Sequence, residues 1–116
     1  AMPMVGAVAG CNLKAGELCY GRPEFGIRSG TIYMHLDLDE LAEQEFNNVL
    51  SQKISDSDRA VALNNKGLIY LKQKRFPEAI LLFEQATKHD PTQDAPKKNL
   101  ELSKAKLAEQ QEGKKT

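Results

Sequence analysis

Residues 60–93 read AVALNNKGLIYLKQKRFPEAILLFEQATKHDPTQ, and this stretch decides the fold of the chain. Four of its residues recur in an earlier stretch, in the same order and at the same spacings. The matched pairs are Gly30 with Gly67, Tyr33 with Tyr70, Ala42 with Ala79, and Phe46 with Phe83, each 37 residues apart. Agreement at all of these positions in one register indicates an internal repeat. The later copy continues with Ala86 and Pro91.

Each copy is predicted to fold as two helices that pack against each other. In the later copy, apolar residues recur at helical spacing from Ala62 to Lys74 and again from Pro77 to Lys88. Pro77 suits a first helical turn, where its missing N–H costs no hydrogen bond. Lys72–Phe76 is the predicted turn. The repeated glycines would allow a close helix crossing, with the repeated alanines opposite them and the repeated aromatic side chains filling the space beside each crossing.

The glycine, tyrosine, alanine, phenylalanine, alanine and proline series resembles the signature of the tetratricopeptide repeat, a helix-turn-helix unit of about 34 residues. The resemblance covers Pro23–Asp56 and Ala60–Gln93. In the earlier copy, Val49 stands at the usual third small residue and Ile54 at the usual proline. The resemblance implies an all-α fold in which two helix-turn-helix repeats form part of a right-handed superhelical array.

A third segment, Asp94–Gln111, is predicted to be a helix that caps the array, so that residues 23–112 form one domain. Pro96 suits its first turn, and its narrow apolar stripe consists of Leu100, Leu107 and Ala108. The charged side chains expected to cover its other side are Glu101, Lys104, Lys106 and Glu109. Residues 113–116, together with Glu112, are expected to be a frayed tail.

Two acidic clusters are assigned to helix capping. Asp56, Ser57 and Asp58 are N-cap candidates for the helix that follows. The offset between the copies is 37 residues rather than about 34, and these three residues are the additional ones. An extended loop is therefore predicted between the repeats. Asp37, Asp39 and Glu40 lie in the predicted turn of the first repeat. Because this second cluster lacks the glycine and the distal glutamate of a calcium loop, helix capping and solubility are predicted for it.

Composition favours one small interaction domain over an enzyme or a nucleic-acid-binding protein. The 116 residues are 41% hydrophobic and 28% charged with no net charge, so there is no basic stripe for a phosphate backbone. His35 and His89 are well separated, and Cys11 and Cys19 lack the spacing of a redox or zinc motif. No catalytic site, metal site or cofactor is predicted. An enzyme-associated role centred on His35 is the alternative from another class.

By the resemblance, the first helix of each repeat lines a concave groove that binds a protein or peptide. The groove residues implied are Arg28, Thr31, Met34, His35, Asn64, Asn65, Leu68, Lys72, Lys98 and Asn99, with Glu24, Ile27 and Val61 beside them. Asn65 and Asn99 stand where many members of the family hold the backbone of an extended peptide. The alternative for Asn65 is a hydrogen bond to the neighbouring helix.

Other kinds of partner would require particular residues at these positions. The two-carboxylate clamp of repeats that bind the tail of cytosolic heat-shock chaperones needs cations and amides at five places, of which only Asn65 fits here. Glu24 and Arg28 replace the first two, and Ala95 and Asn99 the last two. A self-associating scaffold is a further alternative, because an N-terminal helix face without a neighbouring repeat could pair with another copy.

Residues 1–22 admit two interpretations. Val8, Ala9, Gly10 and Cys11 fit a lipobox, which would make Cys11 a lipidation site and the protein a periplasmic or outer-membrane-attached lipoprotein that assists the assembly of pili or secretion machines. A full signal also needs a charged start and a longer apolar core, and this segment has neither. Met2–Gly10 would otherwise be a flexible tail or part of a helix from an earlier repeat, in a cytoplasmic protein. No stretch is long and apolar enough to span a bilayer.

Overall fold

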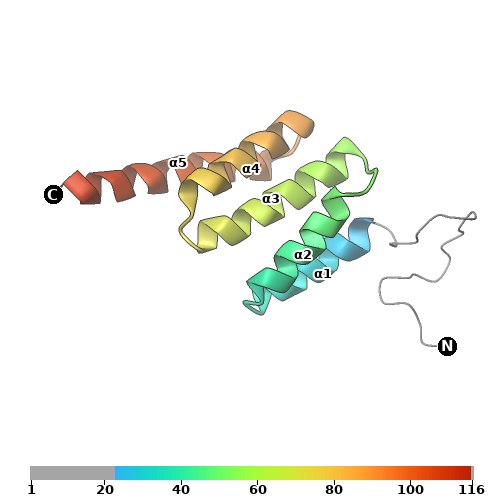
Figure 1. The fold of residues 1–116 in the computed structure, drawn as a ribbon. Helices are drawn as coiled ribbons and strands as arrows, with labels where there is room; N and C mark the ends of the chain where they lie inside the picture. The colour runs from blue at the N-terminus through green and yellow to red at the C-terminus, as the bar shows by residue number, and fades with distance from the viewer. Residues whose placement is uncertain (1–22, 116) are drawn as a thin grey trace, which may run out of the picture.

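A computed structural model describes residues 23–115 of the chain, and the side chains of residues 23–113. These residues form five helices and no strand (Figure 1), which confirms the predicted all-α fold. The helices are α1 Pro23–His35, α2 Asp39–Leu50, α3 Asp56–Lys72, α4 Phe76–His89 and α5 Asp94–Lys115. The predictions made for residues 1–22, Cys11 among them, lie outside the described residues.

The two predicted repeats, α1–α2 and α3–α4, turn between their helices in the same way. Leu38 N donates to Tyr33 O at 2.9 Å, and Arg75 N donates to Tyr70 O at 2.9 Å. Just before these donors, Asp37 and Lys74 both adopt a positive φ, of 60° and 63°. Equivalent residues therefore build equivalent turns, and each repeat is the helix-turn-helix unit that the sequence predicts.

The repeated glycines lie under the repeated phenylalanine rings. A Cβ built on Gly30 would come within 2.6 Å of the Phe46 ring, and one built on Gly67 would come within 2.6 Å of the Phe83 ring. Both rings are fully buried. The close approach was therefore predicted at the right residues, but the group that fills the space over each glycine is an aromatic ring rather than the alanine expected opposite it.

The junction between the repeats differs from the prediction of an extended loop. The helix α3 begins at Asp56, four residues before Ala60, so most of the additional residues lengthen the helix. Its N-cap is Ser55, whose side chain accepts a hydrogen bond from Asp58 N at 3.1 Å. The assignment of the cap to residues 56–58 was therefore wrong by one position, and Asp56 and Asp58 instead lie in the first turn, where negative charge favours the helix dipole.

The added turn of α3 has a structural use. Arg59 lies on it and donates from Nη1 to Leu50 O at 3.1 Å and from Nη2 to Gln52 O at 3.2 Å. Carbonyl groups at the end of a helix lack intrahelical partners, and a cation there complements the dipole. The longer α3 thus lets one side chain hold the end of α2.

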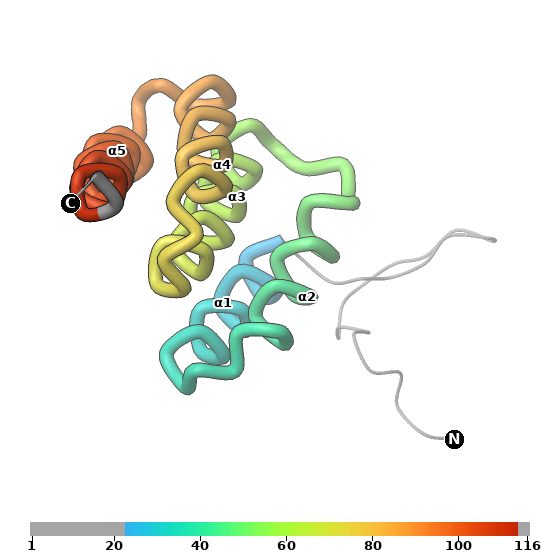
Figure 2. Tube along the Cα trace, turned by 60° about the vertical axis from the view of Figure 1, so that its left-hand side comes forward, coloured from blue at the N-terminus to red at the C-terminus, as the bar shows by residue number. Residues whose placement is uncertain are grey.

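The units stack side by side, with α1 and α2 at one end and α5 at the other (Figure 2). Ile69 of α3 packs in one buried cluster with Ala42 and Phe46 of α2. Leu50, at the end of α2, packs against a second buried cluster, which joins α3 to α4. The second helix of one unit therefore covers one face of the first helix of the next, and α4 packs against α5 in the same order.

The helix α5 is longer than predicted, since it continues past Gln111 to Lys115 and includes Gly113. Between Lys104 and Gly113 every residue except Leu107 is exposed, and this stretch is rich in alanine, lysine, glutamate and glutamine, which favour helix without tertiary support. The predicted apolar stripe was partly wrong. Leu100 and Leu107 are half-buried, whereas Ala108 is exposed and the fully buried side chains are Pro96 and Ser103.

Candidate functional site

The predicted groove residues lie on α1, α3 and α5, the first helices of three successive units. Four of them form a chain of side-chain hydrogen bonds across these helices. Asn99 Nδ2 donates to Asn64 Oδ1 at 2.9 Å, and Asn64 Nδ2 donates to Asn65 Oδ1 at 3.3 Å. Asn65 Nδ2 then donates to Thr31 Oγ1 at 3.4 Å. Thr31 ends the chain by donating to Ile27 O at 2.8 Å. We call Thr31, Asn64, Asn65 and Asn99 the amide ladder.

The amide ladder fixes the side chains that the resemblance assigns to peptide binding. Asn64 is only 7% exposed, so its amide needs partners inside the protein, and Asn65 and Asn99 supply them. The hydrogen bond from Asn65 to the neighbouring helix, one of the two alternatives for this residue, is therefore present. Each Nδ2 carries two hydrogens, and the ladder uses one of each pair.

The remaining groove residues divide into exposed and packed side chains. Arg28, His35 and Lys98 are exposed. Leu68 is half-buried, and Met34 packs against the buried cluster between α2 and α3. Arg28 and His35 on α1 and Lys98 on α5 thus flank a middle part that carries apolar and amide side chains.

The set of groove residues predicted from the sequence does not include Leu102. It lies three residues after Asn99 on α5 and is 45% exposed. It also lies 34 residues after Leu68, so it holds the equivalent position in the next unit. The 34-residue offset from Leu68 could have identified this position. A single leucine on a highly charged helix, however, does not show which face of the helix it lies on unless the neighbouring repeat is compared.

Lys72 is engaged in ion pairs between the repeats. Its Nζ lies 2.7 Å from Asp39 Oδ1 and 3.0 Å from Asp37 Oδ1, and it donates to Met34 O at 3.3 Å. The hydrogen bond from Lys72 is the main cause that lowers the pKa of Asp39, and the same bond raises the pKa of Lys72. Lys72 therefore joins α3 to the α1–α2 turn rather than pointing a free cation into the groove.

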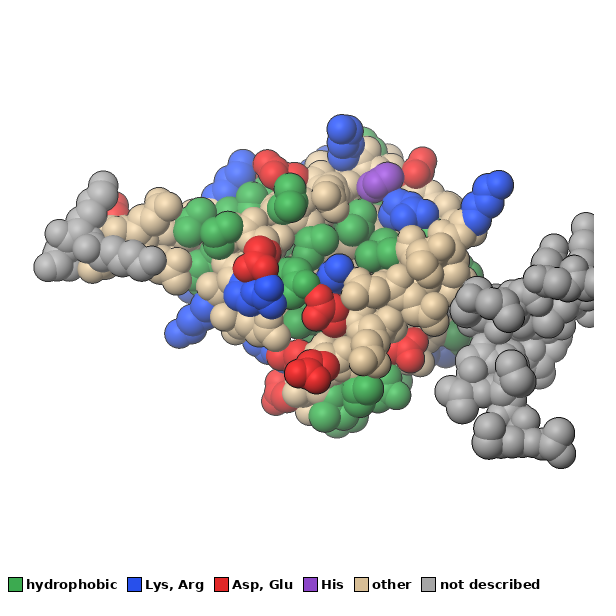
Figure 3. Space-filling model, viewed as in Figure 1, with side chains coloured by type: hydrophobic (Ala, Val, Ile, Leu, Met, Phe, Trp, Pro, Cys, Tyr) green, Lys and Arg blue, Asp and Glu red, His purple; other side chains and the backbone are tan. Residues whose placement is uncertain are grey.

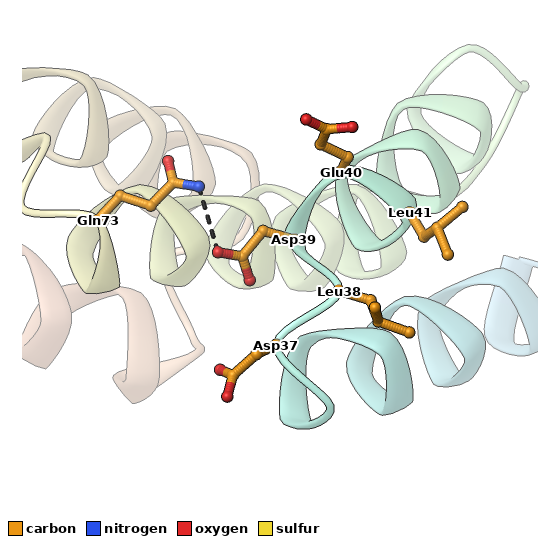
Figure 4. A pocket seen from close by; sticks show the side chains of 6 residues that line it. All are labelled: Asp37, Leu38, Asp39, Glu40, Leu41 and Gln73. Atoms are coloured by element: carbon orange, nitrogen blue, oxygen red, sulfur yellow. Dashed lines mark hydrogen bonds between the residues drawn. The ribbon is translucent and has the colours of Figure 1, made fainter.

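The acidic turn forms the rim of a pocket of about 520 Å³ (Figure 4). Asp39 points toward Gln73, the C-cap of α3, whose Nε2 donates to Asp39 Oδ2 at 3.3 Å, whereas Leu38 and Leu41 point away from it. The prediction that this cluster caps a helix was wrong, because the N-cap of α2 is Leu38 and no side chain caps it. The lining residues are Asp37, Leu38, Asp39, Glu40, Leu41 and Gln73.

A second polar contact joins the repeats, between α3 and α2. Tyr70 donates from its hydroxyl to a carboxylate oxygen of Glu43 on α2, and the Arg75 guanidinium lies 4.3 Å from the centre of the Tyr70 ring. The hydrogen bond to Glu43, followed by burial, raises the pKa of Tyr70 to about 12. The signature tyrosine of the second repeat thus carries an inter-repeat bond in addition to its packing.

The histidines that could support catalysis lie on different helices. His35 ends α1, whereas His89 ends α4 with Nδ1 3.4 Å from Asp56 Oδ1. Among residues 23–113, the structure holds no group of three or more histidine, cysteine, aspartate or glutamate side chains that could bind a metal ion. Within the described helices, none is long and apolar enough to cross a membrane.

This arrangement of stacked helix-turn-helix units defines a helical repeat protein. Residues 60–93 match the sequence model of the tetratricopeptide repeat, and the chain therefore contains a tetratricopeptide repeat in this stretch. The match covers the second repeat, and the first repeat shares its turn and its glycine–phenylalanine crossing. Neither the search of curated proteins nor that of solved structures found a match. Repeats of this family are protein–protein interaction modules, and the chain is such a module.

Proposed function

We propose that the chain is a non-catalytic adaptor or assembly factor, and that an extended segment of a protein partner binds along α1, α3 and α5. The amide ladder is the observation that carries this proposal. It holds Asn65 and Asn99 in fixed rotamers and leaves each a second N–H for a backbone carbonyl. A preorganised donor loses less conformational entropy on binding than a mobile one.

The side chains around the ladder suggest the chemistry of that segment. Leu68 and the 45% exposed Leu102 offer an apolar strip, so an apolar side chain fits beside the ladder. Arg28 and Lys98 are exposed cations on the first and last helices of the row. The partner segment is therefore expected to carry carboxylates on both sides of an apolar residue.

Co-purification with charge-reversed variants tests this function. Wild-type protein and an Arg28→Glu/Lys98→Glu variant would each be incubated with lysate of the source organism, and the captured proteins compared by quantitative mass spectrometry. Lys104→Glu is the matched control, because it reverses a charge on the same helix as Lys98 at an exposed position away from the ladder. We expect specific partners to be depleted by the double reversal and retained by the control.

Two results would contradict the proposal. Partners that are retained by the double reversal would place binding on another surface of the chain. Equal loss of partners in the Lys104→Glu control would show an effect of total charge rather than of Arg28 and Lys98. The Asn65→Ala/Asn99→Ala variant is less selective, because it also removes the partners of the buried Asn64 and is expected to lower stability.

A further inference from the structure

The outward face of α1 carries large apolar residues at positions that are buried in the next unit. Phe25 and Ile32 lie 37 residues before Ala62 and Ile69, and are therefore their equivalents. Ala62 and Ile69 are 0% exposed, whereas Phe25 is 42% exposed and Ile32 is 53% exposed. The same helix face is thus covered at the second unit and largely open at the first.

A helix covers this face wherever a preceding unit exists in the described residues. On α3, Ile69 packs against Ala42 and Phe46 of α2. On α5, the equivalent positions, 34 residues later, are Pro96 and Ser103, which are fully buried on a helix that packs against α4. The face of α1 continues this series of interfaces, and none of the described helices lies against it.

The opposite end of the stack is built differently. On α5, the positions that would hold a following helix are equivalent to Leu63, Gly67 and Tyr70 of α3. They are occupied by Lys97, Glu101 and Lys104, and all three are exposed. Charged side chains favour water over a packed neighbour, so α5 closes the array, whereas α1 leaves it open.

The open apolar face extends around the α1–α2 turn. Leu36 follows Phe25 and Ile32 at helical spacing and is 62% exposed, and Leu38 and Leu41 beyond the turn are each 43% exposed. Hydrophobic side chains gather at the lower edge of the view in Figure 3, over this turn. Contiguous exposed apolar residues rimmed by charge are typical of a protein interaction site.

We propose that this face binds an amphipathic helix of a partner protein, which lies on α1 as α2 lies on α3. Continuity with the α2–α3 interface specifies the chemistry of the helix. Its apolar stripe resembles the stripe of α2, with residues one turn apart like Ala42 and Phe46. Because Phe25 takes more room than the equivalent Ala62, the partner helix carries a small residue opposite it. This docking site is separate from the amide ladder and does not depend on it.

Binding of a helix-stabilised peptide with the sequence of residues 39–50 tests the proposal. The peptide would be titrated into the full chain and followed by fluorescence anisotropy and by backbone amide NMR shifts. We expect shifts centred on α1 and a loss of affinity of at least about tenfold in Phe25→Glu/Ile32→Glu. Leu81→Glu is the matched control, because Leu81 of α4 is 56% exposed and lies away from this face.

Circular dichroism melts of all variants establish that the fold is intact before binding is compared. Equal affinity in Phe25→Glu/Ile32→Glu and wild type, or no binding to wild type, would overturn the proposal. A wild-type dimer that Phe25→Glu/Ile32→Glu dissociates in sedimentation would assign the face to a second copy instead. If the same substitution changed the amide NMR shifts of residues 1–22 in the absence of peptide, the face would be assigned to that segment. Either result overturns docking of a partner helix.

Discussion

The two repeats fill the same helix crossing with side chains of opposite size. In the first repeat, Gly26 of α1 meets Val49 of α2, and a Cβ on Gly26 would lie 2.4 Å from Val49 Cγ2. In the second repeat, the equivalent residues are Leu63 and Ala86, which belong to one buried cluster. Packing constrains the combined volume at the crossing rather than the residue at either position. Val49, which departs from the repeat signature, is thereby accommodated.

The repeats also differ at the junctions that follow their turns. The first turn offers Asp37 and Asp39 to Lys72, which pairs with both. In the second turn the equivalent of Asp37 is Lys74, and it lines a pocket with Lys106 of α5, the equivalent of Lys72. Ion pairs therefore hold the first junction, whereas at the second junction the two lysines share the lining of the pocket with Glu109.

The largest effect is expected where the repeats are most alike, at the glycines under the aromatic rings. Gly67→Leu and Gly30→Leu should each lower the free energy of unfolding by about 3 kcal/mol, because a new side chain would displace Phe83 or Phe46 from a packed site. Thermal and urea unfolding of both variants would measure the loss. If only one of the two were destabilised, the crossings would not be equivalent.

Gly113→Ala is the control for these two variants. A Cβ at Gly113 meets no other atom within 4 Å, and the residue lies in a helix. Replacing glycine by alanine within a helix is expected to stabilise it by up to about 1 kcal/mol. Destabilisation by this control would mean that the losses at Gly30 and Gly67 do not report steric overlap.

A smaller effect is expected at the crossing where the two repeats exchange a large and a small side chain. Gly26→Leu should cost about 1–3 kcal/mol, because the branched Val49 side chain is stiff and cannot turn aside easily. The double variant Gly26→Leu/Val49→Ala reproduces the pair found in the second repeat and should recover much of that loss. A double-mutant cycle from urea unfolding would show a favourable coupling of about 0.5–3 kcal/mol. Additive losses would contradict compensation between the two positions.

The smallest effect is expected at the ion pairs of the first junction. Lys72→Met should cost at most about 1 kcal/mol, because the Lys72 side chain is 39% exposed and that of Asp37 is 83% exposed, so that solvent screens the pair. The folded state lowers the pKa of Asp39, so its contribution is present above the ordinary pKa of 3.8 and is lost as pH falls through the folded value. The folded state raises the pKa of Lys72, so its contribution is lost only as pH rises above about 10.5.

Unfolding of wild type and Lys72→Met, measured from pH 2 to 7, would isolate the contribution of the ion pairs to the free energy of unfolding. The difference between the two proteins should be constant near neutral pH and shrink in acid, as Asp39 becomes protonated. A difference that does not change with pH would assign the effect of the substitution to the packing of the lysine stem. Added salt should reduce the neutral-pH difference, since it screens exposed charges.

The sequence by itself determined the helices, the two turns and the positions of close approach. Gly30, Gly67, Phe46 and Phe83 recur at fixed spacings, and such periodic signals depend on local backbone geometry that the chain carries within each repeat. The same offset placed the predicted groove residues on the first helix of each unit. It also identified the second repeat, which the family match confirms.

Only the tertiary structure decided which polar groups meet and which apolar faces are covered. The pairing of Asn99 with Asn64 and of Asn65 with Thr31 joins residues about 35 positions apart on different helices, and nothing in either local sequence fixes it. Phe25 and Ile69 are both apolar residues on first helices, but one is half-exposed and the other fully buried. Burial at these positions depends on whether a preceding helix is stacked there, and stacking is a property of the assembled array.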